Sequence, residues 1–228
     1  MNLAPATLLG LLRLASPALP VGGFSYSEAL EAAVDAGTAG DEAGTARWLA
    51  AQMQLGLARA ELPLVAAAHA AWAAHDTARL VELNEWMRIT RESAELRAQT
   101  EQMGRSMLEW LRQQGDDPAR VATLAAMQPA PSWPLAFALA ALHTGASAHD
   151  TLLAYGFAWA ENQVQAALKA VPLGQNAGQR ILARLAQELP ALALRALTIG
   201  DEDRQAFAPM LAIMSSRHET QYSRLFRS

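Results

Sequence analysis

The sequence predicts an all-α protein, a single-domain bundle of about ten helices. Alanine, leucine, glutamine, glutamate and arginine dominate the chain, and these residues favour helix, whereas β-branched residues are sparse. No stretch alternates apolar and polar residues over a length that would indicate a strand. Prolines and glycines recur at intervals that suit helix ends. With 228 residues, 52% of them hydrophobic, the chain can bury one sizeable core.

The first half of the chain is expected to hold helices separated by proline and glycine. A helix over about 3–15 stops before Pro17, because the residue before a proline disfavours the α conformation. A second over about 26–36 ends at Gly37, which suits a left-handed cap. The segments that follow are one that contains Trp48 and runs to about Leu57, one that begins near Pro63, and a long region from Asp76 to Gly115 with a break near Thr90–Ser93.

The second half is expected to contain longer helices and then a tail. Ser147 and Asp150 form a capping pair that opens a long helix. The expected segments are one that starts at Asp116, then 133–143, 147–170, 175–188, 191–199, and one from Pro209 to the tail. No long polar linker divides the chain, so we expect one domain over 1–216, followed by a C-terminal partner-binding tail over 217–228.

Composition excludes several classes of function. The net charge is −4, so no overall basic excess indicates binding to nucleic acid or to an anionic membrane. There are no cysteines, which excludes disulfides, thiolate metal sites and a cysteine nucleophile, and which fits a cytoplasmic protein. The apolar run 135–142 is far shorter than the ~20 residues of a membrane span. We expect no metal site and no cofactor.

The stretch LASPALPVGGFSYSEALE, residues 14–31, is unlike the rest of the chain. Ser25 and Glu28 match the S-x-x-E capping box, which predicts reciprocal hydrogen bonds at a helix start. The prolines and glycines would make a stiff corner before that helix. Phe24 and Tyr26 are open to two interpretations: they fill the core beside the loop, or they are presented to a partner.

Two further segments carry polar residues in a helical pattern. Glu92, Glu95, Gln99 and Gln102 share one helix face, which is either a solvated face or a polar stripe at an interface. No glutamate is followed three residues later by histidine, so a di-iron bundle is excluded. The segment KAVPLGQNAGQ starts at Lys169 and indicates either a capped turn or a docking surface.

The tail RHETQYSRLFRS is locally basic in an acidic protein and carries apolar side chains near its end. Aromatic residues and arginine are typical of interface hot spots. The tail either packs back on its own domain or becomes ordered on a partner, and we favour the partner. His218 and Glu219 do not form a zincin site, because Tyr222 stands where H-E-x-x-H has its second histidine.

Four segments together resemble the UreF family of urease accessory proteins. They are SPALPVGGFSYSEALE, RESAELRAQTEQMGRS, VPLGQNAGQ and HETQYSRLFRS, and in the family's order they span residues 16–228. One departure is Ala29, where the family usually has glycine, and we expect this to be a mild change on a helix.

The resemblance implies an all-α protein without catalytic chemistry of its own. It implies a homodimer that binds UreD (also called UreH), recruits the nickel-carrying GTPase UreG, docks on apo-urease in the cytoplasm and helps insert nickel into the urease metallocentre, as an activator or a fidelity gate of the GTPase. The UreG-facing residues would be Phe24, Tyr26, Glu31, Lys169, Gln175 and Gln179. The residues that bind UreD would be Arg217, Tyr222, Arg224, Leu225, Phe226 and Arg227, and Arg224 or Arg227 could alternatively act on the GTPase as an arginine finger.

A second interpretation of the sequence is a helical enzyme or small-molecule-binding protein with a general base in the Glu92/Glu95 stripe. The absence of a paired histidine or of a second paired-carboxylate motif weighs against it.

Overall fold

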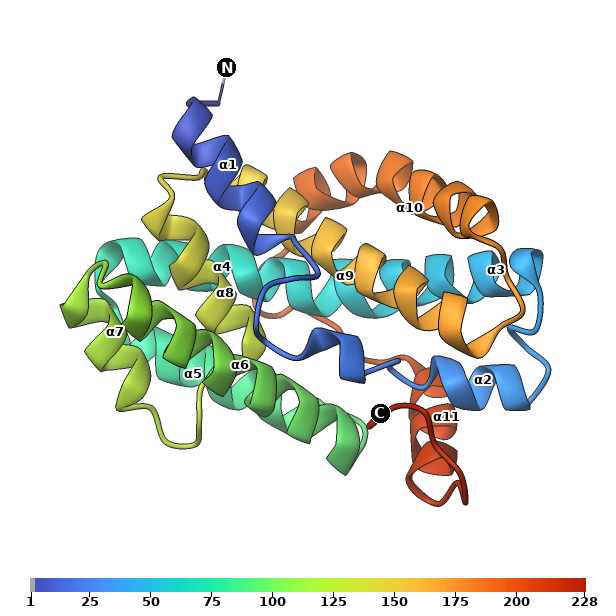
Figure 1. The fold of residues 1–228 in the computed structure, drawn as a ribbon. Coiled ribbons are helices and arrows are strands. Elements are labelled where there is room, and N and C mark those ends of the chain that lie inside the picture. The colour runs from blue at the N-terminus through green and yellow to red at the C-terminus, as the bar shows by residue number, and fades with distance from the viewer. Residues whose placement is uncertain (1–2) are drawn as a thin grey trace.

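The computed structural model describes residues 3–228 and confirms the all-α class (Figure 1). The helices are, in chain order, α1 (Pro5–Leu14), α2 (Leu30–Asp35), α3 (Glu42–Gln52), α4 (Leu62–Ala74), α5 (Thr77–Ile89), α6 (Ala94–Gln114), α7 (Pro118–Ala125), α8 (Trp133–His143), α9 (Ala148–Ala170), α10 (Gln175–Ala196) and α11 (Pro209–Glu219). A 3₁₀ turn over Gly23–Ser25 precedes α2, and a π-helical segment over Met53–Glu61 joins α3 to α4. No strand occurs among the described residues.

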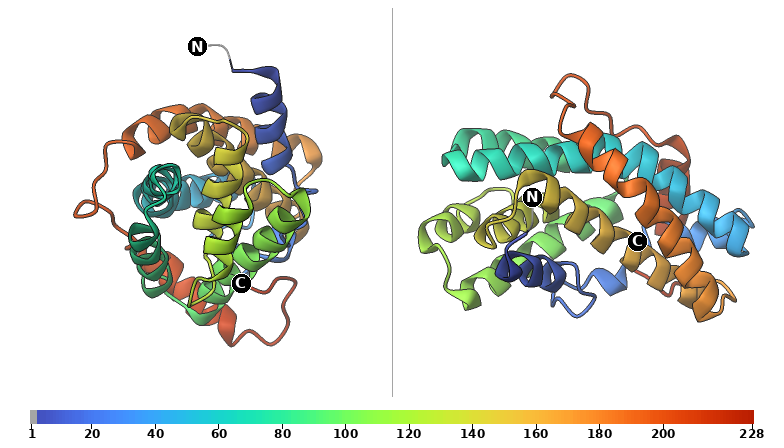
Figure 2. Two further views of the ribbon diagram at one scale, coloured as in Figure 1. Left: turned by 90° about the vertical axis from the view of Figure 1, so that its left-hand side faces the viewer. Right: turned by 90° about the horizontal axis from the view of Figure 1, so that it is seen from above.

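Helix α8 forms the centre of the bundle. It is apolar all round, and residues from Pro134 to Ala141 are buried, as expected of a helix with no solvent-facing side. It packs against α4, α6, α1 and α9, which surround it when the molecule is viewed end on (Figure 2). None of the helices within residues 3–228 is both long and apolar enough to cross a membrane.

Helices α9 and α10 form a long pair beside this core, and here one predicted boundary is wrong. The sequence predicts two helices, 175–188 and 191–199, but α10 is continuous over Gln175–Ala196 with Pro190 inside it. A proline within a helix costs about 3 kcal/mol. Pro190 lies on the exposed side, while Ile181, Leu185 and Leu189 are buried, so packing of the apolar face holds the helix together across the proline.

The predicted separation of helices before Pro63 is also wrong. The chain is helical without interruption from Glu42 to Ala74, with π geometry over Met53–Glu61. Pro63 has no N–H to place in the helical ladder, and it follows directly on the wider turns of the π-helical segment. The last residue of that segment, Glu61, points its carboxylate into the interior.

Other helix ends agree with the sequence. Ser93 caps α6 by accepting from the backbone N–H of Leu96, so the break near Thr90–Ser93 is confirmed. Ser147 accepts from the N–H of Asp150 at 3.1 Å, which confirms the predicted capping pair. Gly37 has a φ of 72°, the left-handed conformation expected at the end of its helix.

The capping box predicted in residues 14–31, which we call the opening corner, does not form. Ser25 lies in the 3₁₀ turn, and the Glu28 side chain bonds to distant side chains rather than to the backbone N–H of Ser25. Glu28 and Ala29 have φ values of 50° and 61°, and α2 begins only at Leu30. Ala29 is therefore not on the helix as expected: it holds a left-handed position, a conformation that glycine adopts more readily than alanine.

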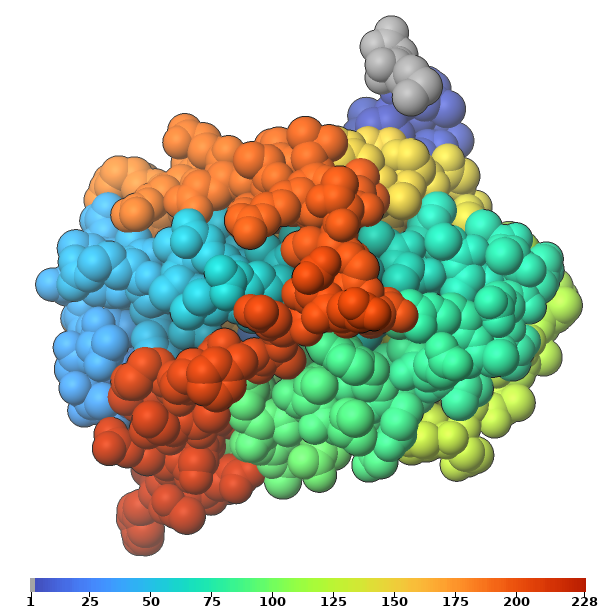
Figure 3. All heavy atoms as spheres, turned by 180° about the vertical axis from the view of Figure 1, so that it is seen from behind, coloured from blue at the N-terminus to red at the C-terminus, as the bar shows by residue number. Residues whose placement is uncertain are grey.

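Helix α11 and the segment after it fold back against α2 and α6. The connection that precedes α11 crosses the surface of the α3–α4 helix, where the N–H of Gln205 donates to the carbonyl of Arg59, and α11 projects at one corner (Figure 3). The boundary expected between 216 and 217 falls inside α11. Phe226 and Ser228 are buried, so the tail packs on its own domain, the first of the two alternatives above.

Candidate functional site

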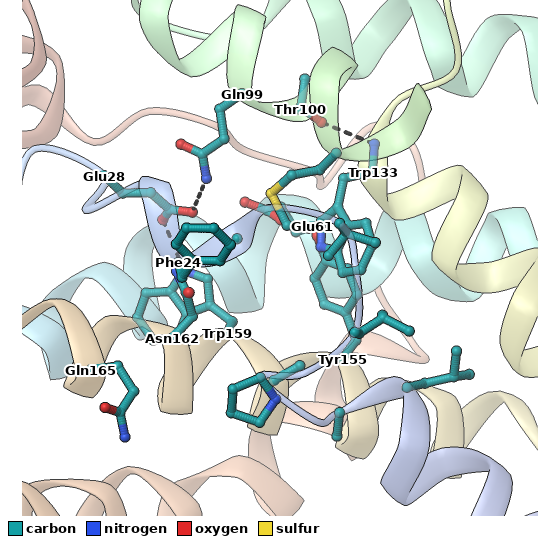
Figure 4. A pocket seen from close by; sticks show the side chains of 18 of the residues that line it. Phe24, Glu28, Glu61, Gln99, Thr100, Trp133, Tyr155, Trp159, Asn162 and Gln165 are labelled. Atoms are coloured by element: carbon teal, nitrogen blue, oxygen red, sulfur yellow. Dashed lines mark hydrogen bonds between the residues drawn. The ribbon is translucent and has the colours of Figure 1, made fainter. Parts of the chain in front are cut away.

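A pocket lies beneath the opening corner, between α6 and α9 (Figure 4). Its volume is about 90 Å³. The apolar part of its lining includes Leu14, Leu19, Met103 and Trp133, and the polar part includes Glu28, Glu61, Arg91, Gln99 and Asn162. The pocket therefore combines an apolar wall with several charged groups that come from segments far apart in the sequence.

Glu61 occupies one side of this pocket, at the end of the π-helical segment. The hydroxyl of Tyr155 on α9 donates to one carboxylate oxygen of Glu61. The guanidinium of Arg91 donates to the other oxygen at 2.9 Å. Burial and the negative charge of Glu61 raise the pKa of the Tyr155 hydroxyl well above its ordinary value, so this hydroxyl remains a donor.

Glu28 occupies the other side. Its carboxylate accepts from the Gln99 amide and from the Trp159 indole N–H, each at 2.8 Å (Figure 4). Burial raises the pKa of the Glu28 carboxyl, and the nearby charge of Glu61 raises it further. The left-handed backbone of Glu28 and Ala29 aims this carboxylate into the pocket.

A second carboxylate cluster, which we call the tail latch, consists of Glu31, Glu95, His218 and Arg224. Glu31 accepts from the backbone N–H groups of Leu225 and Phe226 at 2.8 and 3.1 Å. The buried imidazole of His218 lies between two carboxylates, 3.3 Å from Glu31 and 2.6 Å from Glu95. These contacts attach the tail to α2 and to α6.

The end of the tail also joins the opening corner. Ser27 donates from both its hydroxyl and its N–H to the carbonyl of Ser228, at 2.6 and 3.0 Å. The N–H of Arg227 donates to the carbonyl of Ser25 at 2.9 Å. The Ser228 hydroxyl donates to Gln99 at 2.7 Å, and Gln99 in turn donates to Glu28, so one side chain links the tail latch with the pocket.

The predicted polar stripe is divided between these two clusters. Glu92 precedes α6 rather than lying on it. Glu95 faces the tail latch, Gln99 faces the pocket, and Gln102 is exposed and donates to Ser106. A general base at Glu95 is not supported, because His218 and Arg224 already occupy its carboxylate.

Residues predicted for two separate surfaces meet at one point. The ammonium of Lys169 lies over the rings of Phe24 and Phe226, 5.9 and 5.8 Å from their centroids. Phe24 was expected to face one partner and Phe226 another. The structure places both against the same cation, so the opening corner, the end of α9 and the tail form a continuous surface.

The remaining predicted residues differ in accessibility. Tyr26 is buried in the core, and Glu31 is buried beneath the tail, so neither side chain is presented at the surface. Exposed positions are held by Gln175 and Gln179 on the first turns of α10 and by Arg217, Tyr222, Arg224, Leu225 and Arg227.

Sequence reasoning missed Glu61, Arg91, Tyr155 and Trp159. Glu61 had one available signal, since it is a single carboxylate directly before the apolar run 62–68. Within the described residues, no group of histidine, aspartate and glutamate side chains has an arrangement that could hold a metal ion.

Residues 39–186 match the family model described as UreF. A protein named urease accessory protein UreF from Methylibium petroleiphilum is 62% identical over 98% of this chain and 94% of its own length. Proteins of the same name from Paracidovorax citrulli and a Polaromonas species are 59% and 56% identical over the whole chain, which covers 91% and 97% of them.

Proposed function

Because the chain belongs to the UreF family of urease accessory proteins, we propose that it is a scaffold that binds UreD (UreH) and recruits the GTPase UreG to apo-urease for nickel insertion. The family is one of accessory proteins rather than enzymes, in agreement with the function expected from the sequence. The observation that carries the proposal is the ordered tail, which presents apolar side chains outward while its backbone is held from beneath.

The tail is suited to binding because its order is already established. Glu31 holds the N–H groups of Leu225 and Phe226, while the side chains of Tyr222 and Leu225 are exposed. A segment that is ordered before binding loses less conformational entropy when it docks. Exposed aromatic and aliphatic side chains next to arginines supply hot-spot chemistry. We assign this surface to UreD.

The surface around Lys169 is assigned to UreG. It presents the exposed ring of Phe24 beside the ammonium of Lys169, and Gln175 and Gln179 follow on the next helix. Since Phe226 contacts the same ammonium, the two docking surfaces adjoin one another. Binding of one partner would then affect binding of the other. The proposal includes a homodimer that acts in the cytoplasm, with no role for nucleic acid or membrane.

The test is size-exclusion chromatography with light scattering on mixtures of the full chain, UreD and GTP-loaded UreG. Leu225→Ala is expected to weaken binding to UreD on the order of tenfold, as a hot-spot truncation does. Leu9→Ala is the matched control, since Leu9 and Leu225 are 66% and 69% exposed. Equal effects of the two variants, or no binding of UreD by the unaltered chain, would overturn the assignment of the tail.

The UreG surface is tested in the same way with Phe24→Ala. Its matched control is Ile89→Ala, because both side chains are 62% exposed. We expect Phe24→Ala to weaken recruitment of UreG while binding of UreD is retained. Loss of both partners together would contradict the division of the surface.

A further inference from the structure

Three irregular backbone features converge on the pocket beneath the opening corner. Glu28 and Ala29 adopt successive left-handed conformations, which cost free energy in residues other than glycine. The π-helical segment ends at Glu61, and Arg91 lies in the break between α5 and α6. Strained and π-helical backbone is concentrated at functional sites in proteins. All three features position charged side chains around one cavity.

The charges around the cavity do not balance. Among the described residues that line the cavity, two carboxylates, Glu28 and Glu61, face one cation, Arg91. Arg91 bonds directly to Glu61, whereas the donors to Glu28 are neutral, from Gln99 and Trp159. A mostly buried carboxylate without a paired cation is costly. The raised pKa of Glu28 reflects that cost.

The cavity has room for a further group and an apolar path to it. Its volume of about 90 Å³ is several times the roughly 10–15 Å³ that one water molecule needs. The rings of Trp133, Tyr155 and Trp159 line it, and π faces attract cations. Phe24 is exposed and also lines the cavity, so the cavity reaches the surface at that residue.

We propose that this pocket binds a cationic group on an apolar stem, an alkylammonium or alkylguanidinium, with the Glu28 carboxylate as its counter-charge and the aromatic wall around its stem. An anionic ligand would face two carboxylates, and a neutral ligand would leave the charge on Glu28 uncompensated. Lys169 does not supply the missing cation, because it contacts the Phe24 ring without lining the cavity. The group comes either from a lysine or arginine side chain of a partner or from a free amine.

The first experiment uses the full chain without partners, so its outcome is independent of the proposed scaffold function. Two-dimensional NMR follows the Trp159 indole N–H, assigned with Trp159→Phe, during titration with n-butylammonium chloride. n-Butylguanidinium chloride is the second probe, and sodium chloride and n-butanol are the controls for ionic strength and for the apolar stem. We expect saturable shifts with both cations and none with the controls. A shift that does not saturate, or an equal shift with n-butanol, overturns the proposal.

Two variants link the signal to the pocket. Glu28→Gln removes the counter-charge and is expected to weaken binding on the order of tenfold or more, as loss of a mostly buried charge partner does. Gly23→Leu keeps Glu28 but fills the cavity, since a Cβ there already meets Met103 and Asn162 at 3.5 and 3.4 Å. The matched control is Glu109→Gln on the exposed face of α6. Circular dichroism checks that each variant is folded, and unaltered binding in both pocket variants contradicts the inference.

A final arm identifies the source of the cation. The Trp159 signal is recorded in the complexes with UreD and with UreG. If a partner side chain occupies the pocket, complex formation reproduces the shift without added amine and Glu28→Gln abolishes it. If the ligand is a free amine, n-butylammonium still binds in the complexes with unchanged affinity. Both results support the cationic site, and exclusion of the amine without any shift of Trp159 overturns it.

Discussion

Glu28 and Glu31 are three residues apart at the same corner of the molecule, yet their surroundings differ. Glu31 is buried and is covered by its own chain, because two backbone N–H groups of the tail and the imidazole of His218 surround its carboxylate. Glu28 adjoins a cavity, and its two donors are neutral side chains. The first carboxylate holds the tail in place, whereas the second has no cation bonded to it.

Burial alone therefore does not assign a role to a charged residue. In the tail latch, two carboxylates face a histidine and an arginine, and backbone donors occupy the remaining oxygens. In the pocket, two carboxylates face one arginine. A buried carboxylate with a full set of donors contributes to the stability of the fold. Removing the carboxylate of Glu31 should therefore destabilise the folded chain, whereas removing that of Glu28 should weaken binding of the proposed cationic ligand.

The largest expected effect is that of Glu31→Ala. It leaves two tail N–H groups without their acceptor and removes one of the two carboxylates at His218, and breaking such a buried cluster costs about 3 kcal/mol. We expect a corresponding fall in the free energy of unfolding in urea and faster proteolysis within residues 220–228. Glu109→Ala, at an exposed ion pair, serves as the control. A loss below about 1 kcal/mol would show that the tail latch is not what holds the tail.

Tyr155→Phe tests how much the hydrogen bond between Tyr155 and Glu61 in the pocket contributes to stability. It removes the hydroxyl that donates to Glu61 and leaves one buried carboxylate oxygen short of a donor, which costs about 2 kcal/mol. Thermal and urea unfolding measure the change. The matched control is Tyr26→Phe, since Tyr26 is also a buried residue, 5% exposed, and its hydroxyl has no hydrogen-bond partner among the described residues. If both variants lose the same free energy of unfolding, the hydrogen bond between Tyr155 and Glu61 does not contribute to stability.

Glu28→Gln sharpens the comparison through pH. Above the ordinary glutamate pKa of 4.5, the folded chain retains a proton on Glu28 that the unfolded chain has lost, because burial and Glu61 raise the pKa in the folded state. The contribution of Glu28 to stability is therefore present at low pH and is lost as pH rises through the folded-state pKa. Urea unfolding of both proteins, from pH 4.5 up to neutral pH, should show wild-type stability falling relative to Glu28→Gln. If the difference in free energy of unfolding between the two proteins does not change with pH, the pKa of Glu28 is not raised in the folded chain.

The smallest effect is expected from Arg224→Ala. The arginine side chain is 40% exposed, and exposed ion pairs contribute little because solvent screens them. Glu95 retains its contact with His218, so unfolding should change by less than about 0.5 kcal/mol. A loss above about 1 kcal/mol in the free energy of unfolding would show that Arg224 is needed to hold the tail latch together. With stability unchanged, any loss of partner binding by this variant reports directly on the interface.

Local signals in the sequence predicted much of the fold and little of the pocket. The caps at Ser93 and Ser147 depend on residues within one helical turn, and both are confirmed. The capping box at Ser25 fits the same rule, but Gln99 and Trp159 compete for the Glu28 carboxylate from other helices. Caps predicted from neighbouring residues therefore form where no distant donor competes for the same side chain.

Prolines likewise predict a helix end correctly only where tertiary packing does not override the local rule. Helix α1 ends at Leu14, before Pro17, as predicted, because the residue before a proline disfavours the α conformation. Pro190 does not interrupt α10, since buried residues on both sides of it, Leu189 before and Ala193 after, hold the helix against α9. Ala29 would be a mild substitution in a helix, but the tertiary turn places it in a left-handed conformation.

The helical class, most helix ends and the family could be predicted from the sequence, because these depend on residue type, on neighbours within about four positions and on short motifs. Helix packing, by contrast, brings Glu28, Glu61 and Arg91 to one cavity, places the tail on Glu31, and sets Lys169 against two rings from opposite ends of the chain. These contacts connect segments separated by tens to nearly two hundred residues. Their existence depends on how the helices pack, which no local pattern encodes.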